Sequence, residues 1–104
     1  MIKIVENYKD SIRWYRKYSD GFIEQGGKST RTFATDETWV LVFPRAFTSP
    51  PLSFSTTCIA PRTSDASGSE LGVISGSLTA TGVTLCNDSY GTNKTGFYWE
   101  ARGY

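Results

Sequence analysis

Residues 14–27, which read WYRKYSDGFIEQGG, constrain the fold of this chain more than any other segment. Two stretches rich in aromatic residues flank Asp20-Gly21, a pair that accepts the positive φ angles of a tight reversal. The segment therefore predicts a β-hairpin. A two-residue turn would place Tyr18 opposite Ile23, whereas a three-residue turn with a bulge at Gly21 would shift every pairing by one.

The two strands of this hairpin mix large apolar side chains with long polar ones, so neither face is clearly the solvent-exposed one. This pattern indicates that both faces are at least partly covered, which favours self-association. We expect a subunit interface to include Trp14, Arg16, Glu24 and Gln25. At least one of the three polar residues should be buried and hydrogen-bonded there, because a buried polar group without a partner costs roughly 1–3 kcal/mol.

Residues 38–43 (TWVLVF) predict a strand with apolar side chains on both faces. Trp39, Leu41 and Phe43 point one way, and Val40 and Val42 point the other. Apolar residues on both faces are typical of a central strand that is covered on both sides. A lone domain of this size would usually leave one side wet, so we expect Val40 and Val42 to lie at a subunit interface.

The rest of the chain alternates short extended runs with polar or proline-rich loops, and no segment of ten residues has helical periodicity. Further strands are expected at residues 52–60, 71–80, 83–86 and 97–102. The sequence thus predicts an all-β domain, an antiparallel sandwich of six or seven short strands. Because successive antiparallel strands alternate in direction, we expect the turns at 20–21, 44–51 and 81–82 to lie at one end of the domain. The loops at 28–37, 61–70 and 87–95 should lie at the other end.

Charge and composition exclude several classes of function. The net charge is +1 and the basic residues are spread along the sequence, so we expect no nucleic-acid partner. No apolar run approaches 20 residues, and residues 1–9 lack the apolar block of a signal peptide, so no membrane insertion is expected. Cys58 and Cys86 are either two buried thiols or one disulfide, and the sequence leaves both possibilities open.

Catalytic chemistry has little support in the sequence. The chain has no His, so it lacks the usual base of a Ser-His or Cys-His nucleophile, and two Cys cannot complete a zinc site alone. Carboxylates that could act as a pair lie mostly in polar loops, and no glycine loop leads into a helix that could bind phosphate. We therefore expect no enzyme activity, no catalytic residue, no metal and no cofactor.

Sugar binding is the function that the loops favour. An aromatic face for the ring, combined with amides and charged groups for its hydroxyls, is found around Tyr90, with polar groups in the neighbouring loop. The predicted ligand-binding residues are Tyr90, Asn87, Asp88, Asn93, Arg62 and Asp65. The alternative for each of these residues is an ordinary solvated turn.

Four segments together resemble the C-terminal domain of bacteriophage tail fibre proteins. The hairpin segment resembles the strand-turn-strand at the start of that domain, and residues 43–51 (FPRAFTSPP) its F-P-x-x-F…P segment. Residues 83–85 resemble its penultimate strand, and residues 97–104 (FYWEARGY) its closing aromatic strand. Relatives commonly have Tyr where this chain has Glu100.

The resemblance implies a β-sandwich related to the H-type lectins, assembled as a homotrimer at the tip of a virion's tail fibre and made in the host cytoplasm. It implies attachment to a bacterial surface polysaccharide, either capsule or lipopolysaccharide, and residues 1–11 as a lead-in to a tip domain at 12–104. Two alternatives remain: a structural domain that only trimerises the fibre, and a polysaccharide depolymerase.

Overall fold

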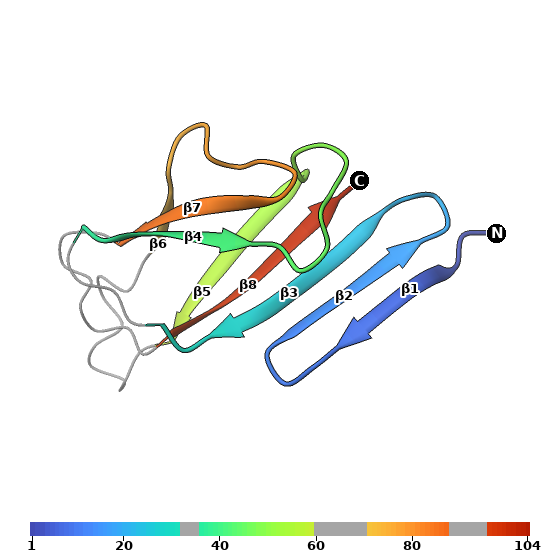
Figure 1. The fold of residues 1–104 in the computed structure, drawn as a ribbon, viewed down its shortest axis with the longest axis horizontal. Coiled ribbons are helices and arrows are strands. Elements are labelled where there is room, and N and C mark those ends of the chain that lie inside the picture. Colours follow the sequence, from blue (N-terminus) through green and yellow to red (C-terminus); the bar gives the residue numbers. More distant parts are fainter. Residues whose placement is uncertain (32–35, 60–70, 88–95) are drawn as a thin grey trace.

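The computed structural model of this chain describes residues 1–31, 36–59, 71–87 and 96–104 (Figure 1). All the secondary structure in these residues is β, and every strand pair is antiparallel. No helix there is long and apolar enough to cross a membrane. The strands are β1 (Ile4–Lys9), β2 (Arg13–Tyr18), β3 (Ile23–Ser29), β4 (Thr38–Val42), β5 (Ser53–Ile59), β6 (Leu71–Val73), β7 (Gly82–Asn87) and β8 (Gly96–Gly103).

The strands form two sheets of unequal size. One sheet has the order β1-β2-β3-β8-β5, and the other has the order β4-β7-β6. Figure 1 shows β4 and β7 crossing the larger sheet near β5 and β8, whereas β1 and β2 extend beyond the crossing. The all-β prediction is confirmed, although the described residues hold one or two more strands than expected.

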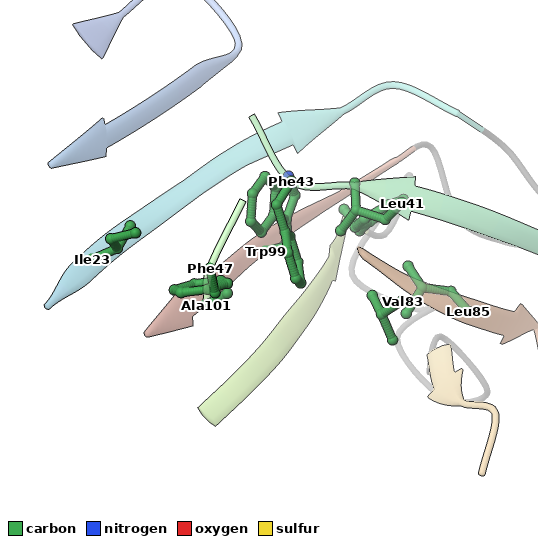
Figure 2. Close-up of a cluster of buried hydrophobic side chains, with 9 residues drawn as sticks. Ile23, Leu41, Phe43, Phe47, Val83, Leu85, Trp99 and Ala101 are labelled. Atoms are coloured by element: carbon green, nitrogen blue, oxygen red, sulfur yellow. The ribbon is translucent and has the colours of Figure 1, made fainter. Parts of the chain in front are cut away.

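The core lies between the two sheets, where strand alternation turns one apolar row of each sheet inward. On β8, Phe97, Trp99 and Ala101 are buried, as their spacing predicts. The Phe43 ring packs against Trp99 with ring centroids 5.7 Å apart (Figure 2). Leu41, Val83 and Leu85 complete the core from the smaller sheet. Burial of each large side chain contributes about 1.5–3 kcal/mol, so this row decides how the sheets pack.

The hairpin between β2 and β3 has a three-residue turn. Arg16 pairs with Glu24, a register shifted by one from the two-residue alternative. The Tyr18 amide donates to the Phe22 carbonyl at 2.8 Å, and Gly21 has a φ of 93°. Gly21 therefore occupies the bulge position that only a residue tolerant of positive φ can take without strain.

Residues 4–9 were expected to lie in a lead-in segment, but β1 pairs with β2 and forms one edge of the larger sheet. The boundary predicted at residue 12 therefore does not separate two structural units. The reversal between β1 and β2 depends on Asp10, whose Oδ1 accepts hydrogen bonds from the amides of Ile12 and Arg13 at 2.8 and 2.7 Å. This carboxylate replaces the backbone partners that the turn lacks.

Strand β4 alternates as expected, with Leu41 and Phe43 buried and Val40 and Val42 exposed. Its predicted central position is wrong, because β4 is an edge strand that pairs only with β7 among the described residues.

Two other expected strands differ in extent. The strand expected at 71–80 is limited to β6, since the chain turns at Ile74–Ser77, where Gly76 has a φ of 76°. The strand expected at 52–60 is limited to β5, and Leu52 precedes it and is exposed.

The predicted end of the molecule that collects the turns at 20–21, 44–51 and 81–82 is observed. The Thr48 amide donates to the Tyr104 carbonyl, and the Tyr104 ring packs against Phe22 beside the hairpin turn. The Phe47 amide donates to the Ala80 carbonyl at 2.8 Å. In the opposite group of loops, residues 61–70, most of 87–95 and residues 32–35 lie outside the described residues.

Candidate functional site

Most of the predicted ligand-binding residues fall outside the described part of the chain: Tyr90, Asp88, Asn93, Arg62 and Asp65. Asn87 ends β7 and is fully buried, and its backbone N–H donates to the Glu37 carbonyl at 2.9 Å. The prediction that Asn87 presents its side chain to a surface ligand is therefore wrong for this conformation. The alternation of β7 turns the side chain inward.

The structure also contradicts the prediction that Gln25 lies at a subunit interface. Its side chain is fully buried within its own chain, beneath the connection between β4 and β5. Gln25 Nε2 donates to the Arg45 carbonyl at 2.7 Å, and Oε1 accepts from the Arg45 amide at 3.0 Å. Its polar groups are thus satisfied by a loop of the same subunit. Val40 and Val42 are 57% and 68% exposed, and their contact with a second subunit stays a prediction.

The side of the larger sheet that faces away from the core is here called the outer face. It carries the other predicted interface residues, Trp14, Arg16 and Glu24. Residues paired in register point to the same side of an antiparallel sheet, which brings together side chains from five strands. The central part of the outer face consists of Asn7, Lys9, Trp14, Arg16, Glu24, Gly26, Lys28, Tyr98, Glu100, Arg102, Ser55 and Thr57.

The Trp14 ring lies close against Gly26, its neighbour on β3, which has no side chain to keep it away. A Cβ on Gly26 would lie 3.0 Å from the Trp14 ring and 2.7 Å from the Trp99 carbonyl oxygen. The Arg16 guanidinium covers the Trp14 ring, with its central carbon 4.9 Å from the ring centroid. This cation–π contact, worth about 0.5–1 kcal/mol at an exposed site, favours the arrangement of the two side chains.

Beside this pair, a chain of hydrogen bonds runs across three strands. The Tyr18 hydroxyl donates to Glu24 Oε1 at 2.6 Å, and Arg102 donates to Glu24 Oε2 at 3.2 Å and to Glu100 Oε2 at 3.1 Å. The Tyr18 hydrogen bond, followed by that from Arg102, lowers the pKa of Glu24 below its ordinary value. Glu24 is therefore held as a carboxylate, and Glu100 remains half exposed beside it.

Two hollows adjoin Trp14 on the outer face. The first, here called the aromatic hollow, has a volume of about 420 Å³ and is lined by Trp14, Ser55, Thr57, Tyr98 and Glu100, with Gly27 and Trp99 below. The second, here called the basic hollow, also has a volume of about 420 Å³ and is lined by Asn7, Tyr8, Lys9, Trp14 and Arg16. Both volumes lie within the range of roughly 300–1,000 Å³ typical of small-molecule sites.

The aromatic hollow offers two aromatic side chains, two hydroxyls and a carboxylate. That combination suits a sugar, whose ring has apolar faces and whose edge carries hydroxyl groups. Tyr98 is 51% exposed, so much of its ring is open to a ligand. Among the described residues, no group of three or more His, Cys, Asp or Glu side chains could hold a metal ion.

Sequence reasoning did not find the residues of the aromatic hollow as a group. Trp14 was assigned to an interface, and Ser55, Thr57 and Tyr98 were placed in strands without a role. One signal was present in the sequence: Gly26 follows the hairpin at the position that pairs with Trp14. With the three-residue turn known, this pairing indicates an aromatic ring lying over a glycine.

Comparison with known proteins identifies the family. Residues 17–104 match the family model described as tail fiber protein gp53-like, C-terminal. The chain belongs to this family of tail fibre C-terminal domains. The resemblance noted in the sequence is therefore confirmed. A search of curated proteins finds no match to the chain.

Solved structures show the same fold in tail fibres of pyocins. An N-truncated R1-type pyocin tail fibre is 21% identical with a TM-score of 0.71, and the match covers 100% of this chain and 86% of that one. An N-truncated R2-type pyocin tail fibre is 18% identical with a TM-score of 0.69, and the match covers 100% of this chain but 38% of that one. A P. aeruginosa R2 pyocin fibre is similar at 18% identity and a TM-score of 0.70, with 26% of its length covered. This domain thus spans less than half of these two R2 fibres.

Proposed function

We propose that this tail fibre domain attaches its particle to a bacterial cell by binding a surface glycan, either capsule or lipopolysaccharide. The observation that carries the proposal is the aromatic hollow, found on a domain of a tail fibre family. Its exposed Tyr98 and its hydroxyl and carboxylate groups supply the two kinds of contact that a sugar needs. The domain would occupy the tip of the virion's fibre.

The proposal includes assembly as a homotrimer and the absence of catalysis. Trimer formation is supported by the exposed apolar side chains of β1 and β4, and several tips engaged together would gain avidity through effective concentration. The lowered pKa of Glu24 argues against Glu24 as the acid of a depolymerase, because a glycosidase acid needs a raised pKa to hold its proton.

The alternative is a structural role, in which the domain only trimerises and aligns the fibre while receptor contact occurs elsewhere. The open apolar face of β4 favours this reading, since it suits packing between subunits better than sugar binding. The two readings differ in what the isolated domain binds. A structural domain would not adsorb to susceptible cells.

The test compares Tyr98→Ala with Tyr104→Ala, a matched exposed tyrosine outside the two hollows. Binding of each variant to an array of structurally defined bacterial capsular and lipopolysaccharide glycans is measured. We expect Tyr98→Ala to weaken binding about tenfold or more, equivalent to about 1.4 kcal/mol, and Tyr104→Ala to leave it unchanged. Equal binding by wild type and Tyr98→Ala would remove the aromatic hollow from the site.

A further inference from the structure

Cations of the larger sheet differ in whether a carboxylate pairs with them. Toward the inner side, Lys17 and Arg45 both pair with Glu6, at 3.8 and 3.1 Å, and Arg13 pairs with Asp10 at 3.5 Å. On the outer face, Arg102 pairs with Glu24 and Glu100. Three other cations there have no carboxylate within 4 Å among the described residues: Lys9, Arg16 and Lys28. The register places all three around Trp14, since Lys9 pairs with Trp14 and Lys28 lies two residues beyond Gly26.

Positive charge is therefore concentrated where the sequence showed only spread basic residues. The first and last of these cations are 19 residues apart in the sequence, and three neighbouring strands bring them together. Lys28 is further held by the Tyr98 ring, 5.8 Å from its Nζ. Unpaired charges gathered in this way raise the local concentration of an oppositely charged ligand.

Arg16 is prepared to bind an anion. Its guanidinium lies over the Trp14 ring, and its Nε is buried with no hydrogen-bond partner in the part of the chain that the structure describes. A guanidinium held in one plane presents its N–H groups in the fork that matches a carboxylate or a phosphate. Lys9 adds a second positive charge to the same basic hollow.

Trp14 lines both hollows, so a ligand that fills one lies directly beside the other. A single sugar in the aromatic hollow would place the next residue of its chain near the basic hollow. The outer face also carries Glu24 and Glu100, which would repel a polymer with a charge on every unit. This arrangement suits a glycan whose anionic groups are spaced by neutral sugars.

We propose that the receptor is an acidic glycan, with one sugar in the aromatic hollow and a carboxylate or phosphate group of the adjoining residue held by Arg16 and Lys9. This inference rests on the proposed function, because it names the class of glycan bound at the same face. It adds that binding depends on charge. Lys28 contributes to the field around Trp14 without lining the basic hollow.

The experiment uses the same array of bacterial glycans, with each acidic glycan also presented after carboxyl reduction or after removal of its phosphate. Arg16→Gln and Lys9→Gln are compared with Lys3→Gln, an exposed cation outside the basic hollow, and folding is checked by circular dichroism. Arg16→Lys keeps the positive charge but removes the paired N–H donors of the guanidinium.

We expect wild type to bind acidic glycans, and Arg16→Gln to weaken this binding roughly tenfold or more, as expected for loss of a charged hydrogen bond. Lys9→Gln should weaken it less, and Arg16→Lys should restore only part. Loss of binding after carboxyl reduction identifies a uronic acid type of ligand, and loss after phosphate removal identifies a phosphate ester. Lys3→Gln should bind as wild type does.

The inference is overturned while the proposed function stands if neutral glycans bind in a Tyr98-dependent manner and Arg16→Gln has no effect. If no glycan binds, the proposed function and the inference both fail. Tighter binding of a single-stranded oligothymidylate than of any glycan would also overturn the inference, because the face would then be a nucleic-acid site.

Discussion

At the scale of single residues, Gln25 shows what a buried polar group requires. Its side-chain amide lies beneath the connection between β4 and β5, and both of its polar atoms are satisfied by the backbone of Arg45. The sequence predicts that a polar residue in this strand is buried and hydrogen-bonded. It cannot say whether a loop of the same chain or a second subunit provides the cover, since Arg45 lies 20 residues away.

Replacement of Gln25 by Leu should destabilise the domain. The change keeps the approximate volume but leaves the amide and carbonyl of Arg45 without partners, at a cost of about 1–3 kcal/mol. Urea unfolding followed by tryptophan fluorescence measures this difference. Asn7→Leu, on the exposed outer face, is the control and should change stability by less than about 0.5 kcal/mol. Equal stability of Gln25→Leu and wild type would show that the loop bonds contribute nothing.

Asp10 should make the β1–β2 reversal sensitive to acid. Hydrogen bonds from the Ile12 amide, the Tyr8 hydroxyl and the Arg13 amide lower the pKa of Asp10 from 3.8 to about 2. Because the folded pKa is depressed, the contribution of the carboxylate is complete above about pH 4 and is lost as the pH falls through 2.

The measurement is urea unfolding of wild type and Asp10→Asn at several values between pH 5 and pH 2. Asn keeps an acceptor but cannot titrate. We expect wild type to be the more stable protein at pH 5 and the difference to shrink steadily toward pH 2. A difference that does not change with pH would exclude Asp10 as the titrating group.

At the scale of elements, local patterns were reliable where a strand alternates against the core. The inward row of β8 and the alternation of β4 follow from side chains pointing to opposite faces. The patterns did not predict the features that depend on which strands pair with one another. The residues of β1 were assigned to a lead-in segment, and only their pairing with β2 makes them part of the sheet. The edge position of β4 likewise depends on which strands lie beside it.

The turn between β2 and β3 offers a test of the hairpin register. Gly21 has a φ of 93°, so Gly21→Ala should cost about 1–2 kcal/mol from the left-handed backbone. Gly72→Ala is the matched control, since an added Cβ there meets only the Cys86 carbonyl oxygen at 3.9 Å. Thermal unfolding compares the two variants. A Gly21→Ala protein as stable as the control would argue against the three-residue turn.

At the scale of the whole molecule, the candidate site comes from long-range register. The hollows combine residues of β1, β2, β3, β8 and β5, and four successive strand pairings bring these residues together. The sequence predicts each strand, but it does not give the register of each strand pair with enough accuracy to place residues across four pairings. A register error of one residue turns every side chain of a strand to the opposite face. For this reason the predicted site was placed in loops, where composition is readable without register.

The unequal sheets also leave apolar surface that a single chain does not cover. Val40 and Val42 project from the outer side of the smaller sheet, and Ile4 and Val5 are exposed on β1. Covering such surface stabilises a protein by about 25 cal/mol for each Å² removed from water. A second and third copy of the chain are the cover that the proposed trimer supplies.

Sedimentation equilibrium of the isolated domain tests the trimer, with an expected mass of three times 11.5 kDa. The double variant Val40→Asp/Val42→Asp should shift the mass toward the monomer, because two desolvated carboxylates without partners oppose burial. Leu52→Asp, at an apolar residue that is 76% exposed next to β5, should leave the mass unchanged. A wild-type monomer would contradict the trimer, whereas a trimeric double variant would place the interface on a face other than that of Val40 and Val42. In the second case the exposed side chains of β1 become the next surface to change, and the outer face with its two hollows keeps its proposed role.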